Sequence, residues 1–250
     1  MDNEKLKIAT EAGKILSDIL KIIYSELKVS ISAEEIDNKI HKLIKEKKAE
    51  PSFLHYQGFP NSSCISFNEE IVHGIPNDRK IKDGDIIKVD VGLYFKGIHV
   101  DAAFSKGIGN ISENDKKMIR ICKNALNIAT DAISINHTTG DMGDRLQEYI
   151  EKNGFSVVRD YCGHGIGEKL HMAPSLPNFG KSGTGQKFEN SCMYAIEPMI
   201  TNGNYETVLD KNHWTVKTKD GSRSAHFETT FALFNNKLVN LVPFILSNKT

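Results

Sequence analysis

The sequence predicts an internally duplicated α+β fold, because the same order of elements occurs twice along the chain. Each copy begins with two stretches of helical periodicity and continues into β-rich segments, and the copies lie about 108 positions apart. The two pseudo-repeats are expected at about 3–107 and 112–242, within a single domain over residues 1–250. A chain of 250 residues is long enough to bury a full core in one domain.

The first copy opens with a helix over residues 3–27, in which apolar residues recur at helical spacing. A second helix follows Ser32. The pair Ser32 and Glu35 matches a capping box, in which each side chain binds the backbone N–H of the other residue. The segment 63–104 contains β-rich apolar runs separated by turn residues, so it predicts strands.

The second copy repeats this order after a glycine at position 109. Helical periodicity covers residues 112–133 and again 139–150, and strands are predicted from Phe155 onward. The glycine-rich stretch 178–186 predicts a surface loop. Long linkers are absent, which agrees with a single domain.

Two aspartates interrupt the apolar runs of the first copy. Asp90 stands at the centre of the run 86–95 and Asp101 within 98–104, and Lys96-Gly97 between them predicts a hairpin turn. A carboxylate in an apolar strand is paired or binds a cation. The fold-back is expected to bring the two carboxylates close to opposite each other, where they repel unless a divalent ion lies between them. The alternative is that each aspartate lies in solvent at a strand edge.

Three later residues extend this set of candidate metal ligands. His164 is surrounded by three glycines in 162–167, and Glu197 and Glu228 each stand as single carboxylates inside a strand signal. Four carboxylates and one imidazole make a hard, oxygen-rich set, which suits Mn, Fe or Co better than a thiolate-type zinc centre, although zinc remains an alternative. Such a set can hold two divalent ions about 3.5–4 Å apart.

These residues resemble the type I methionine aminopeptidases, which belong to the pita-bread metallopeptidases. The resemblance runs from about Lys5 to Val242 and includes His-Gly-Ile-Pro at 73–76 and Gly-His-Gly-Ile-Gly at 163–167. Prolidase and aminopeptidase P share the order of ligands, but 196–199 and 214–220 resemble the methionine enzyme in particular. The fold implied is a curved antiparallel β-sheet with two pairs of helices on its outer face.

The resemblance also implies an activity, which is removal of the N-terminal methionine from nascent or newly made proteins when the second residue is small. Two divalent metal ions would activate the attacking water. The residue matching Asp90 chelates one ion, those matching His164 and Glu197 hold the other, and those matching Asp101 and Glu228 bridge both. Glu197 is in addition expected to transfer protons.

The resemblance assigns roles to two further histidines and to a substrate pocket. His171 matches the histidine that faces the scissile carbonyl, and His73 matches the one near the scissile nitrogen, although either alone could be a solvated loop histidine. Aromatic and thiol walls suit a thioether side chain. The residues that match the methionine pocket are Phe53, Tyr56, Phe59, Cys64, Leu170 and Trp214, each of which could also be an ordinary core residue, and His73 and His171 are expected to contact the substrate beside them.

Two departures from the family pattern concern neighbours of the predicted site. Thr229 follows Glu228 where the family usually has histidine, and Met172 follows His171 where an acidic residue is common. Because all five predicted ligands are still present, the two departures affect the groups around the ligands rather than metal binding itself. Glu197 lies only 26 positions after His171, which leaves no room for the helical insertion of type II enzymes. With no Cys-rich extension at the N-terminus, a short, bacterial-type enzyme fits best.

Composition limits the partners and the location. The formal net charge is zero, so neither nucleic acid nor an anionic membrane is an expected partner. The charged start predicts no signal peptide, and no apolar stretch approaches a membrane span, so the cytoplasm is the expected location. The expected partners are the N-termini of nascent polypeptides. A ribosome contact is left open, and a monomer is expected.

Three other classes of protein are alternatives, and each predicts a feature that differs from this sequence. A proline-directed pita-bread peptidase would usually carry a separate N-terminal domain, and a non-enzymatic pita-bread binding protein would have lost ligands. The four cysteines form no C-x-x-C pair and are expected to be reduced thiols. Cys162 lies two positions before His164, but a Cys-His dyad lacks a third orienting residue, and it competes with the metal role of His164.

Overall fold

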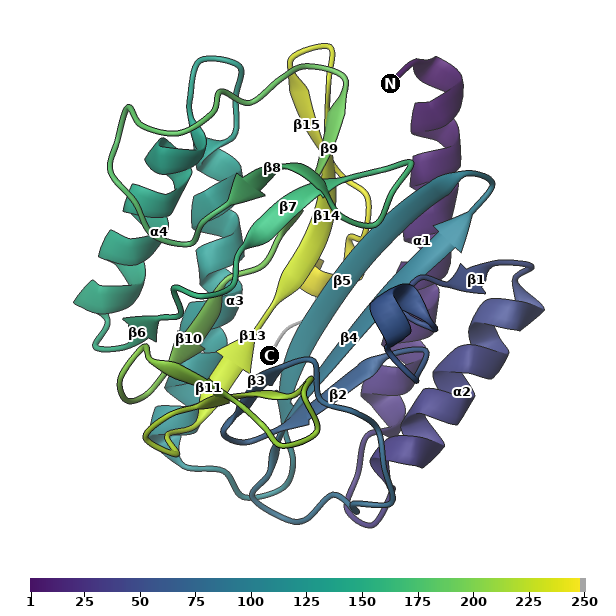
Figure 1. Cartoon of the computed structure of the whole chain (residues 1–250), viewed down its shortest axis with the longest axis vertical. Coiled ribbons are helices and arrows are strands. Elements are labelled where there is room, and N and C mark those ends of the chain that lie inside the picture. Colours follow the sequence, from purple (N-terminus) through teal and green to yellow (C-terminus); the bar gives the residue numbers. More distant parts are fainter. Residues whose placement is uncertain (248–250) are drawn as a thin grey trace.

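Two pairs of helices frame a curved antiparallel sheet in the computed structural model, which describes residues 1–247 (Figure 1). Each pair precedes a group of strands, as the element order in the sequence predicts. The helices are α1 (Asn3–Glu26) and α2 (Ala33–Glu46) in the first group, α3 (Glu113–Ala132) and α4 (Thr139–Lys152) in the second, and the short α5 (Phe244–Ser247). None of the helices in residues 1–247 combines the length and apolar character needed to cross a bilayer.

The long helices begin at side chains that cap their first turn. The predicted capping box is present at α2, where the Glu35 N–H donates to Ser32 Oγ at 3.1 Å and the Ser32 N–H donates to Glu35 Oε2 at 2.7 Å. Thr138 and Asp141 form a second capping box at the start of α4. These caps satisfy backbone N–H groups that have no partner within the helix.

Replacing Ser32 with alanine should lower the free energy of unfolding by about 1 kcal/mol, because the Glu35 N–H loses its acceptor, Ser32 Oγ. The measurement is the urea midpoint at unchanged slope. Ser25→Ala is the matched control, since the Ser25 hydroxyl binds the Ile22 carbonyl at an exposed position near the end of α1. Equal midpoints for Ser32→Ala and wild type would contradict a stabilising role for the capping box.

The main sheet has nine strands within the described residues, and its neighbouring strands pair antiparallel. Its path runs β1 (Glu50–Pro51), β4 (Ile86–Phe95), β5 (Ile98–Gly107), β14 (Glu228–Phe234), β9 (Cys192–Ile196), β7 (Gly163–Ile166) and β8 (Met172–Leu176), with β2 (Cys64–Phe67) beside β4 and β15 (Lys237–Asn240) beside β14. Two three-stranded sheets adjoin it, formed by β13 (Ser224–His226), β10 (Met199–Thr201) and β6 (Ser156–Val157), and by β11 (Thr207–Leu209), β12 (Val216–Thr218) and β3 (Glu70–Val72).

The hairpin of β4 and β5 closes at the predicted Lys96-Gly97 turn. Both turn residues have positive φ, 48° and 90°, as a two-residue type I′ turn requires. This turn sets the register, in which Asp90 pairs with Ala103 and Asp101 pairs with Gly92. The two aspartates thus lie close to opposite each other, as expected, with an offset of two positions. They are diagonal neighbours on one face of the sheet, because residues two apart on a strand point the same way.

The hydrophobic core lies between the sheet and the helices. Val89 and Val91 alternate with Asp90, point to the opposite face of β4 and are fully buried. They join one apolar cluster with Leu16 and Leu20 of α1, which packs along β4 and β5 (Figure 1). The helices thus cover one face of the sheet, and the face that carries the aspartates is left to form a site.

Candidate metal centre and active site

The five predicted ligands come from five strands that are neighbours in the sheet. In the order β4, β5, β14, β9 and β7, they are Asp90, Asp101, Glu228, Glu197 immediately after β9, and His164. The three ligands within β4, β5 and β14 are buried, with 8% of Asp90, 3% of Asp101 and 2% of Glu228 exposed. The alternative that the aspartates lie in solvent is therefore wrong. Sheet pairing alone brings these side chains to one place.

The donor atoms form two overlapping groups of a size that can hold a metal ion. One group is Asp101, His164 and Glu228, and the other is Glu197, His226 and Glu228. Within the described residues, several buried oxygens here have no hydrogen-bond partner, namely Asp90 Oδ1, Asp101 Oδ1 and Glu228 Oε1. Buried carboxylate oxygens are costly to leave unpaired. The residues present therefore fit a divalent cation.

Electrostatics lead to the same conclusion. Burial, followed by repulsion from neighbouring carboxylates, raises the pKa of Asp101 and of Glu228 well above the usual range. Burial also raises the pKa of Asp90 to about 7 and that of Glu197 to about 8. These carboxylates cannot all carry charge at neutral pH unless a cation neutralises them.

His164 is oriented as a ligand by its own backbone neighbourhood. Its Nδ1 lies 2.9 Å from the Gly165 carbonyl oxygen, which accepts the proton and leaves the lone pair on Nε2. That Nε2 lies 3.7 Å from Glu197 Oε1. Burial lowers the pKa of His164 to about 4, so the imidazole is neutral at physiological pH. Glycine is required at 165, because a Cβ there would lie 2.2 Å from the Ala173 carbonyl oxygen of β8.

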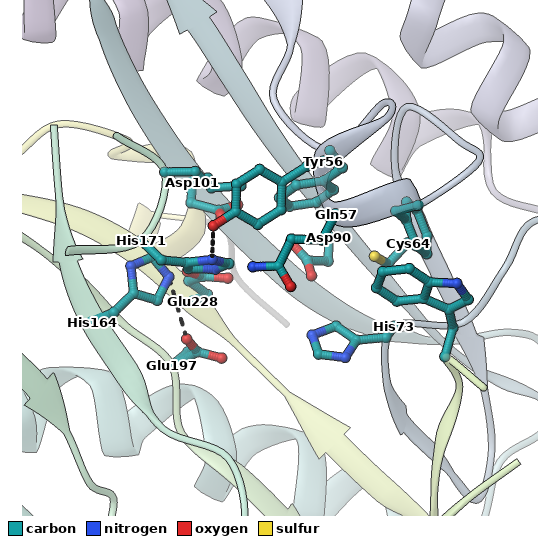
Figure 2. A pocket seen from close by; sticks show the side chains of 14 residues that line it. Tyr56, Gln57, Cys64, His73, Asp90, Asp101, His164, His171, Glu197 and Glu228 are labelled. Carbon is teal, nitrogen blue, oxygen red and sulfur yellow. Dashed lines mark hydrogen bonds and ion pairs between the residues drawn. The ribbon is translucent and has the colours of Figure 1, made fainter. Parts of the chain in front are cut away.

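A pocket of about 270 Å³ opens directly onto the donor atoms. In Figure 2, His164 and Glu197 lie on one side of this pocket, and His73 and Cys64 on the other. All the predicted ligands and all the predicted pocket residues line it, and so does Gln57, which the sequence analysis missed. Gln57 lies in the short 3₁₀ turn Tyr56–Gly58 with φ of 50°, a conformation with no signal in the apolar pattern.

The two histidines that the family resemblance singles out lie on different walls of the pocket. His171 Nδ1 is 2.9 Å from the Tyr56 hydroxyl, and its ring stands edge-on to that of His164 with centroids 4.4 Å apart. His73 has φ of 57°, a left-handed conformation that is uncommon outside glycine, and its ring packs edge-on against Tyr161. Burial lowers the pKa of His73 to about 4.

One apolar side of the pocket depends on a glycine in β4. Gly92 lies opposite Asp101, and a Cβ there would come within 2.6 Å of the Phe53 ring. The glycine thus admits an aromatic side chain beside the carboxylates. On the far wall, Phe59 and Trp214 pack edge-to-face with centroids 5.2 Å apart. The result is a slot with apolar walls and a charged floor.

The two departures from the family pattern have different surroundings. Thr229 Oγ1 binds Asn240 Oδ1 and the Val242 carbonyl at 3.2 and 3.3 Å, so it ties β14 to the segment that follows β15. Met172 is 42% exposed. Cys162 is a free thiol whose pKa is raised by burial, which disfavours the thiolate that a nucleophile needs.

Sequence reasoning also missed His226, the last residue of β13. It is fully buried, and its Nε2 lies 3.6 Å from Glu197 Oε2. The available signal was its position two residues before Glu228, since alternate residues of an extended segment share a face.

Comparisons with known proteins agree with this geometry. The sequence profile of metallopeptidase family M24 matches residues 7–233. A methionine aminopeptidase of Clostridium perfringens is 40% identical over 94% of both chains. The crystal structure of the methionine aminopeptidase from Rickettsia prowazekii superposes with a TM-score of 0.94 and 34% identity, over 97% of this chain and 98% of that one.

A more distant match shows the extent of the shared fold. A prolidase structure from Pyrococcus horikoshii gives a TM-score of 0.78 at 18% identity, and the match covers 62% of that longer chain. At this identity the likeness concerns the fold alone, and it confirms the predicted pita-bread architecture. The matches to the Clostridium and Rickettsia proteins are closer and cover nearly the whole of each chain. The chain therefore belongs to metallopeptidase family M24 and, within that family, to the methionine aminopeptidases.

Proposed function

We propose that this metal-dependent hydrolase removes the N-terminal methionine from nascent or newly made proteins when their second residue is small. The observation that carries the proposal is one pocket in which an apolar slot meets five convergent donor residues. The full set of ligands argues against a non-enzymatic binding protein on the same fold. Family membership implies divalent metal. Two ions, with Mn, Fe or Co favoured by the oxygen-rich donors, form the finer proposal.

The proposed roles of the ligands are those that the family resemblance implies. Asp90, Asp101, His164, Glu197 and Glu228 would hold the ions, and the family resemblance assigns Asp90 to one ion, His164 and Glu197 to the other, and Asp101 and Glu228, the two most buried carboxylates, to both. Divalent ions held there lower the pKa of water and polarise the scissile carbonyl. Glu197 is proposed in addition to transfer protons, because it lines the pocket in which the attacking water would be held.

The proposed roles of the two histidines follow from their hydrogen bonds and surroundings. If the Tyr56 hydroxyl donates to Nδ1 of His171, then Nε2 carries the proton and can donate to the oxyanion that develops on the substrate carbonyl. His73 lies across the pocket, where we propose that it contacts the scissile nitrogen (Figure 2). The apolar slot between them would take the methionine side chain.

The proposed substrates are the N-termini of polypeptides, which reach the pocket as extended chains. The balanced charge of the chain gives no reason to expect nucleic acid as a partner. Work in the cytoplasm and a monomeric state stay predictions from the sequence. A proline-directed peptidase is the second candidate, and the shared prolidase fold is the observation that keeps it in the test below.

Specificity supplies the test, in a panel of tripeptides that differ only at the first two positions. Met-Ala-Ser and Met-Gly-Ser should be cut, and Met-Lys-Ser and Met-Phe-Ser spared. Norleucine at the first position should be removed with a loss in kcat/KM of roughly 10–200-fold, because the slot detects shape and apolar surface more than sulfur. Charged or β-branched first residues should be far poorer substrates.

The readout is release of the free first amino acid over a range of substrate concentrations. Ala-Pro-Ser is the competing substrate for the second candidate. Efficient cleavage of Ala-Pro-Ser or of Leu- and Lys-initiated peptides, with Met-Ala-Ser poor by comparison, would refute the proposal and favour a broader or proline-directed aminopeptidase.

A further inference from the structure

His226 is a buried histidine whose ring has no hydrogen bond. Only 1% of the residue is exposed, and within the described residues neither Nδ1 nor Nε2 has a partner. The ring belongs to neither the pocket wall nor the apolar core. A buried imidazole with two unsatisfied nitrogens is costly, so this side chain requires an explanation.

Its Nε2 faces two of the carboxylates. It lies 3.6 Å from Glu197 Oε2 and 3.9 Å from Glu228 Oε2, and these three residues form one of the donor groups that can hold an ion. Both separations are too long for hydrogen bonds. They do suit ligands of a shared ion, since atoms bound at about 2.0–2.2 Å to one metal lie at most about 4.4 Å apart.

Glu197 lies between two imidazoles. Its Oε1 faces Nε2 of His164 at 3.7 Å, and its Oε2 faces Nε2 of His226 at 3.6 Å. The two donor groups, one with His164 and one with His226, share Glu228. The arrangement therefore places a second imidazole beside Glu197 and Glu228.

The backbone of His226 is fixed so that the ring keeps this direction. Its N–H donates to Ser105 Oγ at 2.9 Å, and the Ser105 hydroxyl lies 2.7 Å from the His226 carbonyl oxygen and donates to it. Ser105 belongs to β5, the strand that carries Asp101, so both residues are held by the same element.

We propose that His226 is a sixth metal ligand, which supplies a second imidazole beside Glu197 and Glu228. The inference rests on the metal centre of the proposed function and deepens it. A centre with two imidazoles is softer than one with four carboxylates and a single imidazole, so it should favour Co and Zn over Mn more strongly than the five-residue set would. The competing explanation is that the ring moves closer and donates a hydrogen bond to a carboxylate without touching an ion.

Paramagnetic NMR of the full chain separates these explanations. In Co²⁺-loaded protein labelled with ¹⁵N-histidine, each ligating imidazole gives one strongly shifted ring N–H resonance. Two such resonances are expected for the wild type. His226→Gln should lose one and His164→Gln the other, and His137→Gln, in the loop between α3 and α4, should retain both.

Titration of the metal-stripped protein with Co²⁺ gives an independent measure. Loss of a direct ligand in His226→Gln should weaken one binding step by at least the roughly 10–100-fold that follows loss of an outer partner. His137→Gln should titrate as wild type does.

The outcomes distinguish this inference from the function on which it rests. The role of His226 is overturned if the wild type gives a single shifted resonance that is lost in His164→Gln and retained in His226→Gln. If that wild-type protein still cleaves Met-Ala-Ser, the proposed function stands. Two resonances without cleavage support the ligand and contradict the function. Failure to bind Co²⁺ would overturn both. A count of one shifted resonance in the wild type overturns the role of His226 even if a variant does not fold.

Discussion

The Asp101→Asn protein is expected to release no methionine from Met-Ala-Ser at any metal concentration. Asp101 is 3% exposed and belongs to the donor group with His164 and Glu228. Asparagine preserves its size but removes one negative charge from a buried site proposed to hold two cations. The cations are then under-compensated, and neither their binding nor their action on water is preserved.

Chelation provides the matching experiment on the wild type. Stripping the metal should abolish activity, and Mn, Fe or Co should restore it, whereas Asp101→Asn should not recover with any of them. Bound metal is measured by elemental analysis alongside methionine release. Asp18→Asn, an exposed change on α1, is the matched control and should behave as wild type. Full activity in the metal-stripped wild type would disprove the metal hypothesis.

Replacing His171 with alanine should lower kcat by roughly 10²–10³ and change KM little, as loss of a donor to an oxyanion does. The ring stands beside His164 at the open end of the site, and the Tyr56 hydroxyl holds its Nδ1 at 2.9 Å. The histidine is expected to act on charge that develops only in the transition state, so substrate binding is largely retained.

Steady-state kinetics on Met-Ala-Ser measure this separation of kcat from KM. Tyr56→Phe removes the hydroxyl that orients His171 and keeps the ring, so it should lower kcat by a smaller factor. His137→Ala lies outside the pocket and serves as the control. An unchanged kcat in His171→Ala would contradict a catalytic role for His171.

Features that depend on near neighbours in the chain were predictable from the sequence. The Ser32–Glu35 capping box joins residues three positions apart, and the Lys96-Gly97 turn needs only positive φ at two adjacent positions. The pita-bread fold and the family were identified from motifs that are contiguous in the chain, and both are confirmed. The pocket residues named from the same motifs all line the pocket.

Features that depend on pairing between distant segments were not predictable in the same way. Thr230 of β14 binds the backbone N–H and carbonyl oxygen of Asp101 from 129 positions away, through two bonds of 2.8 Å. Periodicity within a strand predicts which residues share a face, but it does not predict which strands become neighbours.

The sequence by itself therefore determined the chemistry of this protein, because the type of a side chain and its place in a local motif decide whether it can ligate a metal or line an apolar slot. Only the tertiary structure decided the geometry. It arranged β4, β5, β14, β9 and β7 as neighbours, so that the five predicted ligands, which are far apart in the chain, converge. It also brought His226 from β13 to the same carboxylates, because the close packing of two sheets, rather than any local pattern, determines what a buried ring faces.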